Sequence, residues 1–206
     1  MGVTQSAGLS LRWFRDHLAG NLASKPGVDP YDILTAEAAA TPAGADGLLW
    51  TPYLMGVRTP QLYPEARAVL AGLTASHTRG HIVRAILEGV AFSLKDTFSL
   101  FDEMQVPVGT VRLGGGGARS ALWRQIQADV YSHEVEILAA EEGAAYGAAL
   151  LAGVGAKFWS SVDDACDAVV KVQQRVRPDS GAVKALAIQY ENFRRLYPAL
   201  KPLFAQ

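Results

Sequence analysis

The feature that most constrains the fold is a long stripe of large apolar residues between Thr78 and Phe101. The stripe repeats at intervals of three and four residues, and it consists of Ile82, Val83, Ile86, Leu87, Val90, Leu94, Phe98 and Phe101. This repeat is the period of an α-helix with a broad buried face. A stripe this wide needs cover from several other elements, so we predict a central helix over residues 78–101.

Short apolar segments alternate with helical patterns on both sides of this helix. The predicted strands are 47–52, 68–73, 110–114 and 135–138. The other predicted helices are 7–18, one between Pro30 and Pro42, 118–131, 141–153, 162–170 and 181–196. This alternation predicts an α/β fold with a layered core. We expect Thr74 or Ser76 to cap the central helix, since a hydroxyl there can accept from the first amides of the helix.

Size and composition exclude several classes of protein. The 206 residues suffice for one large domain or a compact pair of subdomains, and 50% of them are apolar. The net charge of -1 argues against nucleic acid or a membrane surface as main partner, because both require a basic face. The single cysteine, Cys166, excludes an internal disulfide and favours a reducing compartment, which we take to be the cytoplasm. The sequence enters a helix almost at once, so we expect a piece of a longer chain.

Four consecutive glycines, residues 114–117, separate a predicted strand from a predicted helix. Two known phosphate-binding loops are excluded, because Arg119 stands where the dinucleotide pattern needs its third glycine and the sequence Gly-Lys-Ser/Thr is absent. Bare backbone amides beside a helix N-terminus nevertheless favour an anionic ligand. The alternative is a sharp turn, for which one or two glycines suffice. We therefore interpret the run as a nucleotide contact.

Three further patterns have a structural and a functional interpretation. Gly143 and Gly147 lie four residues apart on a predicted helix, and we expect tight packing there that supports the glycine run from behind. His77 and His81 have the spacing of a zinc helix, but the glutamate and a third ligand are missing, so we predict a capping or packing role. Glu88, within the apolar stripe, is either a buried anchor or a residue that reaches a cleft.

Arg58 and Arg67 flank a loop near a strand end, which is where α/β proteins tend to bind ligands. A solvated surface charge explains them equally well. The sequence shows neither a Ser/His/Asp triad signature nor a pair of carboxylates at a diagnostic spacing.

Residues 68–88 resemble the second signature of the FGGY carbohydrate kinases. They read Ala-x-Leu-x-Gly-Leu, then seven residues, then His-Ile-x-x-Ala-Ile-Leu-Glu. The pieces "LLWTPYLMGVRTP", "GGGARSALWRQIQADV", "EEGAAYGAALLAG" and "ENFRRLYPAL" are similar to the same family and follow in the same order. The resemblance covers nearly the whole chain. It implies an actin-like fold of two ribonuclease-H-like domains, each with a mixed sheet flanked by helices, around a cleft.

The resemblance also implies a division of the chain and a set of ligands. Residues 1–45 would be a helical lead-in and residues 46–206 the C-terminal, nucleotide-binding domain, with the N-terminal sugar-binding domain absent. The residues that the resemblance places against ATP are Gly115, Gly116, Gly117, Ala118 and Ser120. Magnesium would be carried by the nucleotide, with no metal ligand from this chain. The resemblance also allows a homodimer of the full-length enzyme.

The implied reaction is transfer of the γ-phosphate of ATP to a sugar, with the 5-hydroxyl of D-xylulose as the expected acceptor. The Asp-x-Gly-Thr-Thr motif and the catalytic base of the family are not found here, so we expect no catalytic residue in this chain and no activity from it alone. Met55 and Val57 replace a serine and a glutamate of the family's "SGERTP" loop, which leaves Arg58 as a candidate cleft residue. The alternatives are another sugar or polyol (ribulose, gluconate, fuculose, glycerol) and a non-catalytic actin-like nucleotide-binding module.

Overall fold

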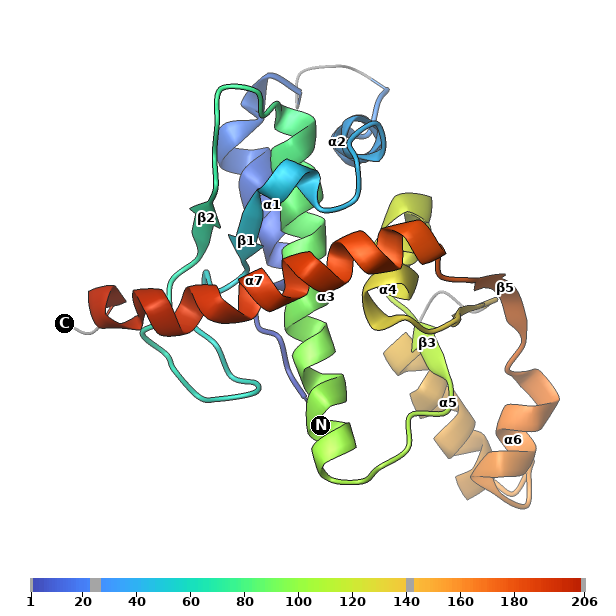
Figure 1. Ribbon diagram of the computed structural model, residues 1–206. Coiled ribbons are helices and arrows are strands. Elements are labelled where there is room, and N and C mark those ends of the chain that lie inside the picture. Colours follow the sequence, from blue (N-terminus) through green and yellow to red (C-terminus); the bar gives the residue numbers. More distant parts are fainter. Residues whose placement is uncertain (1, 23–26, 140–142, 205–206) are drawn as a thin grey trace.

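The computed structural model describes residues 2–22, 27–139 and 143–204 (Figure 1). The helices are α1 (Ala7–Leu18), α2 (Pro30–Ala39), α3 (Arg79–Glu103), α4 (Ala121–Tyr131), α5 (Gly143–Gly155), α6 (Val162–Val169) and α7 (Ser180–Phe204), with 3-10 turns at η1 (Gly20–Leu22), η2 (Ala45–Gly47) and η3 (Gly116–Arg119). The strands are β1 (Leu49–Thr51), β2 (Val69–Ala71), β3 (Val111–Leu113), β4 (Val135–Leu138) and β5 (Val172–Val176). Of the predicted helix 141–153, Glu141 and Glu142 lie outside the described residues.

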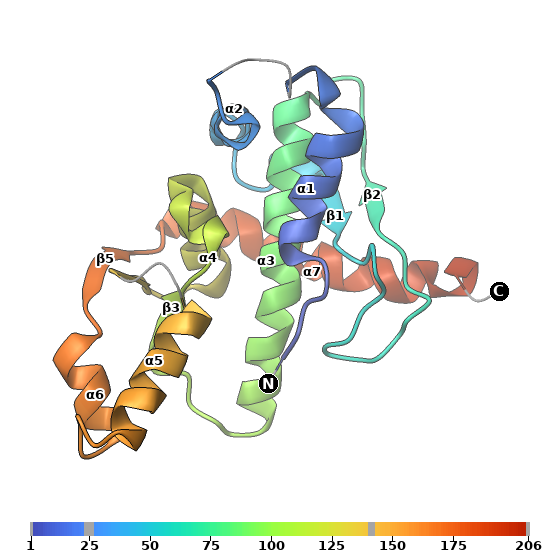
Figure 2. The same cartoon turned by 180° about the vertical axis from the view of Figure 1, so that it is seen from behind.

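Helix α3 is the centre of the fold, as its apolar stripe predicted. α1, α2, α4, α7 and β1 all pack against it, and α1 runs alongside it (Figure 2). Every residue from Val83 to Ser93 is buried, so this stretch is covered on all sides. Gly80 and Gly89 permit that cover, because a Cβ at Gly80 would lie 2.6 Å from the Glu37 carbonyl oxygen and one at Gly89 would overlap the Trp50 carbonyl.

The cap of α3 differs from the prediction. Thr78, not Thr74 or Ser76, is the N-cap, and its amide donates to Nδ1 of His81 at 3.1 Å. The Thr74 and Ser76 hydroxyls instead bond to each other at 2.8 Å in the preceding turn. A hydrogen bond from the Thr74 amide to Nδ1 of His77, at 2.8 Å, closes this turn. The helix therefore begins after the turn.

Two small sheets flank the central helix. β1 and β2 form an antiparallel pair, with Trp50 opposite Leu70. The second sheet has the order β3-β4-β5, with β3 parallel and β5 antiparallel to β4. This mixed sheet, with helices around it, confirms the predicted α/β class.

Strand β5 was not predicted. Its centre is Gln173, Gln174 and Arg175, which are exposed and carry no apolar signal. The strand is held by its backbone pairing and by charge pairs to β4: Arg175 Nη2 lies 3.0 Å from Glu136 Oε1. Arg112 of β3 lies 3.2 Å from the same carboxylate, so one glutamate joins three strands.

Helix α7 crosses the molecule in front of α3 in Figure 1 and is longer than predicted. The predicted helix ends at residue 196, whereas α7 continues to Phe204 with Pro198 and Pro202 inside it. The buried side chains of α7 are Leu186, Tyr190 and Phe193. The Tyr190 hydroxyl donates to Asp96 Oδ1 of α3 at 2.7 Å and so ties the two helices together.

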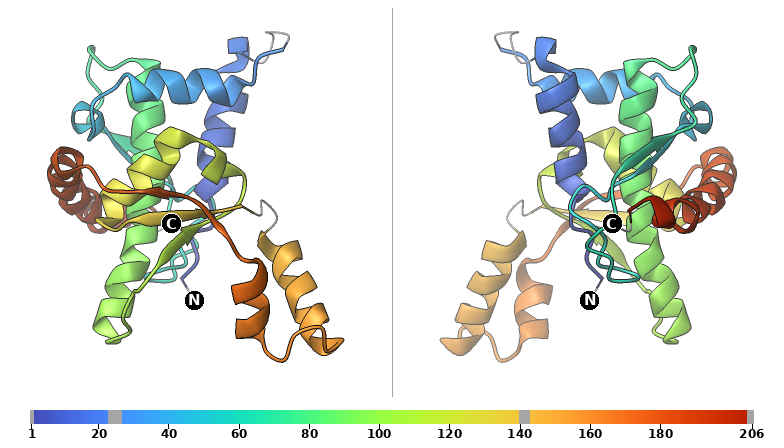
Figure 3. Two further views of the ribbon diagram at one scale, coloured as in Figure 1. Left: turned by 90° about the vertical axis from the view of Figure 1, so that its right-hand side faces the viewer. Right: turned by 90° about the vertical axis from the view of Figure 1, so that its left-hand side faces the viewer.

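Helices α5 and α6 form a pair that stands out from the rest of the molecule (Figure 3). The Tyr146 hydroxyl of α5 donates to the Val169 carbonyl of α6 at 3.0 Å. The prediction that Gly143 and Gly147 pack tightly behind the glycine run is wrong for the described chain, because a Cβ at either position would meet no described atom within 4 Å. Gly143 and Gly147 are therefore not explained by packing within the described residues.

Candidate functional site

The glycine run forms the turn that joins β3 to α4. β3 ends at Leu113, the chain passes through Gly114 and Gly115, and η3 then leads to α4. Gly115 has φ +79°, a left-handed conformation that costs other residues energy. β3 and β4 are parallel, so the turn lies at the carboxyl edge of a parallel pair, where α/β proteins bind ligands.

The outer side of this turn is open. A Cβ at Gly114, Gly115 or Gly116 would meet nothing within 4 Å among the described residues. Gly117 differs, because a Cβ there would lie 3.1 Å from Nε1 of Trp123 on α4. Packing thus explains the fourth glycine and backbone geometry explains Gly115, whereas Gly114 and Gly116 leave bare backbone facing open space.

The N-terminus of α4 points toward the same turn. Ser120 is its N-cap, and the Ser120 hydroxyl accepts from the Trp123 amide at 3.3 Å. The Ala118 amide is used within the turn, donating to the Gly115 carbonyl at 3.0 Å. A hydroxyl can donate while it accepts, so the cap leaves the Ser120 proton available to a ligand. The partial positive charge of the helix N-terminus favours an anion at this place.

Arg58 lies away from the glycine run. It is exposed, in the loop between β1 and β2, and this loop lies on the opposite side of α3 from β3 and α4 (Figure 1). Val57 and Tyr63 exchange two backbone hydrogen bonds, at 3.0 and 2.9 Å, and these bonds shape the loop. Arg67 has a structural role there: its Nη1 donates to the Glu65 carbonyl at 2.6 Å. The structure therefore does not bring Arg58 and the glycines together.

Of the two histidines, His81 takes part in the cap of α3, as predicted, and His77 closes the turn before the helix. His81 accepts from the Thr78 amide through Nδ1, and its Nε2 lies 3.0 Å from Asp46 Oδ2. His77 accepts from Thr74 in the preceding turn. No group of three or more His, Cys, Asp or Glu side chains in the described part of the chain could hold a metal ion.

Glu88 is a buried anchor, and this decides between the two roles that the sequence allowed, an anchor or a residue that reaches a cleft. It is 2% exposed, and its Oε1 accepts from Arg84 Nε at 2.6 Å and from the Gly44 amide at 3.0 Å. Arg84 Nη1 also donates to the Thr41 carbonyl at 3.2 Å. Burial raises the pKa of the Glu88 carboxyl, and Arg84 acts against that rise. The pair joins α3 to the segment after α2 and does not reach a cleft.

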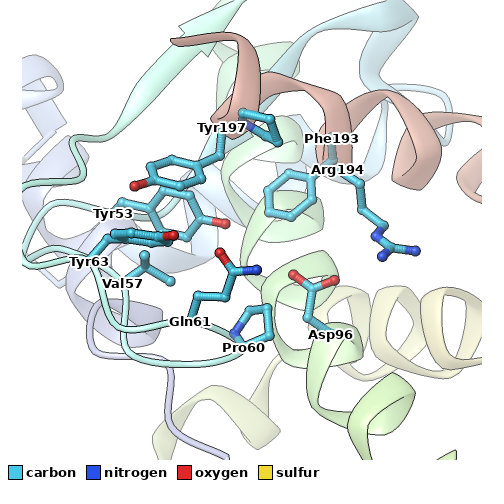
Figure 4. Close-up of a pocket in the computed structure, with 10 residues that line it drawn as sticks. Tyr53, Val57, Pro60, Gln61, Tyr63, Asp96, Phe193, Arg194 and Tyr197 are labelled. Atoms are coloured by element: carbon cyan, nitrogen blue, oxygen red, sulfur yellow. The ribbon is translucent and has the colours of Figure 1, made fainter. Parts of the chain in front are cut away.

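A hollow of about 170 Å³ that the sequence did not indicate lies between the β1–β2 loop, α3 and α7 (Figure 4). Its walls are aromatic, with Tyr53 and Tyr197 edge to face at 5.7 Å between ring centres. Asp96 is 8% exposed and points into the hollow from α3. Asp96 and Tyr190 form a hydrogen bond but lie 94 residues apart in the sequence, so no local sequence pattern could have indicated their contact.

No helix among the described residues is both long and apolar enough to span a membrane.

The comparisons with known proteins agree with one another. Residues 1–156 match the model of the FGGY family of carbohydrate kinases, C-terminal domain. Xylulose kinase from Bacillus subtilis is 36% identical over 203 residues, covering 98% of this chain and 39% of that protein. Gluconokinase from the same organism is 41% identical over 154 residues, covering 73% of this chain and 30% of that protein.

The solved structures give the same result. The crystal structure of xylulose kinase from Rhodospirillum rubrum superimposes with a TM-score of 0.81 at 36% identity, covering 97% of this chain and 39% of that one. The chain therefore belongs to the FGGY family of carbohydrate kinases and has their actin-like α/β fold. It spans about two fifths of the length of the relatives it matches.

Proposed function

We propose that this chain is the nucleotide-binding half of a sugar kinase that transfers the γ-phosphate of ATP to the 5-hydroxyl of D-xylulose. Membership of the FGGY family supports the kinase class. The observation that carries the choice of sugar is coverage: the Bacillus subtilis xylulose kinase matches over 98% of the chain, and the gluconokinase over 73%. D-gluconate is the second candidate, because the gluconokinase is more identical over the part it matches, at 41% against 36%.

The proposed nucleotide contacts are Gly115, Gly116, Gly117, Ala118 and Ser120. The open face at Gly116 fits a group that presses against backbone, and the adjacent N-terminus of α4 fits its negative charge. When bound, ATP with Mg²⁺ supplies the phosphoryl group. We assign the magnesium ion to the phosphates of the nucleotide, as in the expectation drawn from the resemblance.

The role of this half is to position the nucleotide. Phosphoryl transfer depends on alignment of donor and acceptor and on stabilisation of charge. We assign the base and the sugar contacts to the N-terminal domain of a longer protein. Arg58, exposed on its loop, is proposed to reach the cleft when the two domains close.

A coupled assay with D-xylulose, or D-gluconate, and MgATP tests this division of labour. The chain alone is expected to show no turnover, because it would lack the base. Turnover of this chain at an ordinary enzymatic rate, about 1–1000 per second, would contradict the assignment.

A further inference from the structure

The hollow beside α7 is separate from the proposed nucleotide site. Its lining residues come from the β1–β2 loop, α3 and α7, whereas the proposed nucleotide contacts lie between β3 and α4. Its volume of about 170 Å³ equals that of about six water molecules in the liquid, at roughly 30 Å³ each. The hollow therefore has room for a molecule with a short carbon chain and is too small for a nucleotide.

Aromatic rings form one wall of the hollow. Tyr53 and Tyr197 meet edge to face, and the ring centre of Tyr63 lies 5.4 Å from that of Tyr197. Phe193 lies next to Tyr53, with 6.4 Å between ring centres. The three tyrosine rings lie together on one side of the hollow in Figure 4. Aromatic walls with a few polar groups are typical of sites that bind small molecules.

The polar groups of the hollow lie opposite these rings. In Figure 4 the Gln61 amide and the Asp96 carboxylate point into the same space, and Arg194 extends from α7 toward Asp96. Burial raises the pKa of Asp96, and Tyr190 and Arg194 act against that rise, so the guanidinium lies within electrostatic reach of the carboxylate. Asp96 Oδ1 accepts from the Tyr190 hydroxyl at 2.7 Å, and a carboxylate has further acceptor positions for a ligand.

The charges around the hollow favour a neutral ligand. The Asp96 carboxylate would repel an anion. Arg194 and Lys201 would repel a cation, since Lys201 Nζ lies 3.9 Å from the ring centre of Tyr63 in the same wall. A wholly apolar ligand would leave the polar groups unpaired, which is unfavourable. A hydroxyl group suits a carboxylate, an amide and a guanidinium alike, because it both donates and accepts.

We propose that this hollow binds a small neutral polyol, at a site separate from that of the sugar that accepts the phosphate. The hydroxyls of the polyol bond to Asp96, Gln61 and Arg194, and its carbon chain lies against the tyrosine rings. Gln61 belongs to the same loop as Arg58, so an occupant also ties this loop to α3 and α7.

Saturation-transfer NMR on the chain alone tests the proposal. The probe is erythritol, an uncharged polyol with a short carbon chain, and a saturation-transfer signal from it is expected. Tetramethylammonium and acetate are the charged comparison probes and are expected to give no signal. Absence of a signal from erythritol would overturn the proposal. A signal from a charged probe in its place would identify an ionic ligand and would also overturn it.

Substitutions at exposed positions make the test specific to the hollow. Arg194→Met and Gln61→Leu each remove hydrogen bonds to the polyol, and each is expected to weaken erythritol binding at least about fivefold. The matched controls are Arg195→Met on α7 and Gln174→Leu on β5, which are exposed positions outside the hollow and are expected to leave binding unchanged. Circular dichroism checks that all four variants are folded. Equal binding by Arg194→Met and Arg195→Met would overturn the proposal.

These measurements are independent of the proposed function, because erythritol is neither the nucleotide nor a sugar proposed for the reaction. A chain that binds MgATP and does not bind erythritol would refute the polyol site alone. A chain that binds erythritol and does not bind MgATP would refute the proposed nucleotide contacts alone.

Discussion

Gly89→Ala is expected to destabilise the fold although alanine favours helices. Gly89 lies in the fully buried stretch of α3, where β1 crosses it. The added carbon would lie 2.9 Å from the carbonyl carbon of Trp50 and closer still to its oxygen, whereas ordinary contact begins at 3.4 Å. Either α3 or β1 must then retreat by roughly 1 Å through a close-packed core.

The magnitude follows from two opposing effects. Alanine contributes about 1 kcal/mol of helix propensity, and overpacking against backbone costs about 3 kcal/mol. The net loss of about 2 kcal/mol corresponds to a fall in Tm of about 4–8 °C for a chain of this size. Thermal unfolding followed by circular dichroism measures it.

The matched control is Gly147→Ala on α5, where the added carbon would meet no described atom within 4 Å. This variant is expected to keep or raise the Tm of the chain. If Gly89→Ala were as stable as the control, the close approach of α3 and β1 would be refuted.

Two further predictions concern Asp96 and Arg58. Burial raises the pKa of Asp96 above its ordinary value of 3.8, so the folded chain keeps a proton there that the unfolded chain loses, and stability falls as the pH rises from about 3.8 to the folded pKa. Asp96→Asn keeps an acceptor for Tyr190 and is expected to match the wild-type Tm near pH 4 and exceed it at pH 7; equal Tm values at pH 7 would contradict the shift. Arg58→Ala in the longer enzyme is expected to lower kcat for every sugar by a similar factor, and steady-state rates that reverse the ranking of xylulose and gluconate would place specificity in this half.

The parts of the fold with a strong periodic signal could be predicted from the sequence. The stripe of α3 from Ile82 to Phe98 alternates at three and four because the helix is covered by several elements, and it predicted the central position. The glycine run was placed correctly between β3 and α4, since only a turn there tolerates so much bare backbone.

The predictions that failed concern elements whose contacts are with residues distant in the sequence. β5 is held by backbone pairing and by Arg175 against Glu136, and its exposed glutamines give no apolar period. α7 continues through Pro198, which local rules treat as a stop. The two interpretations of Glu88 could be separated only by its contacts with Arg84 and Gly44.

Calorimetric titration of the chain with MgATP tests the central claim most directly. Gly116→Val adds a side chain to the open face of the turn, and its matched control is Gly109→Val, another exposed glycine whose Cβ would meet nothing within 4 Å. Both variants are expected to remain folded by circular dichroism, since neither new side chain meets a described atom at its Cβ. The account predicts that Gly116→Val abolishes ATP binding while Gly109→Val preserves it. Unchanged affinity in Gly116→Val would contradict the account and leave the glycines as a turn alone.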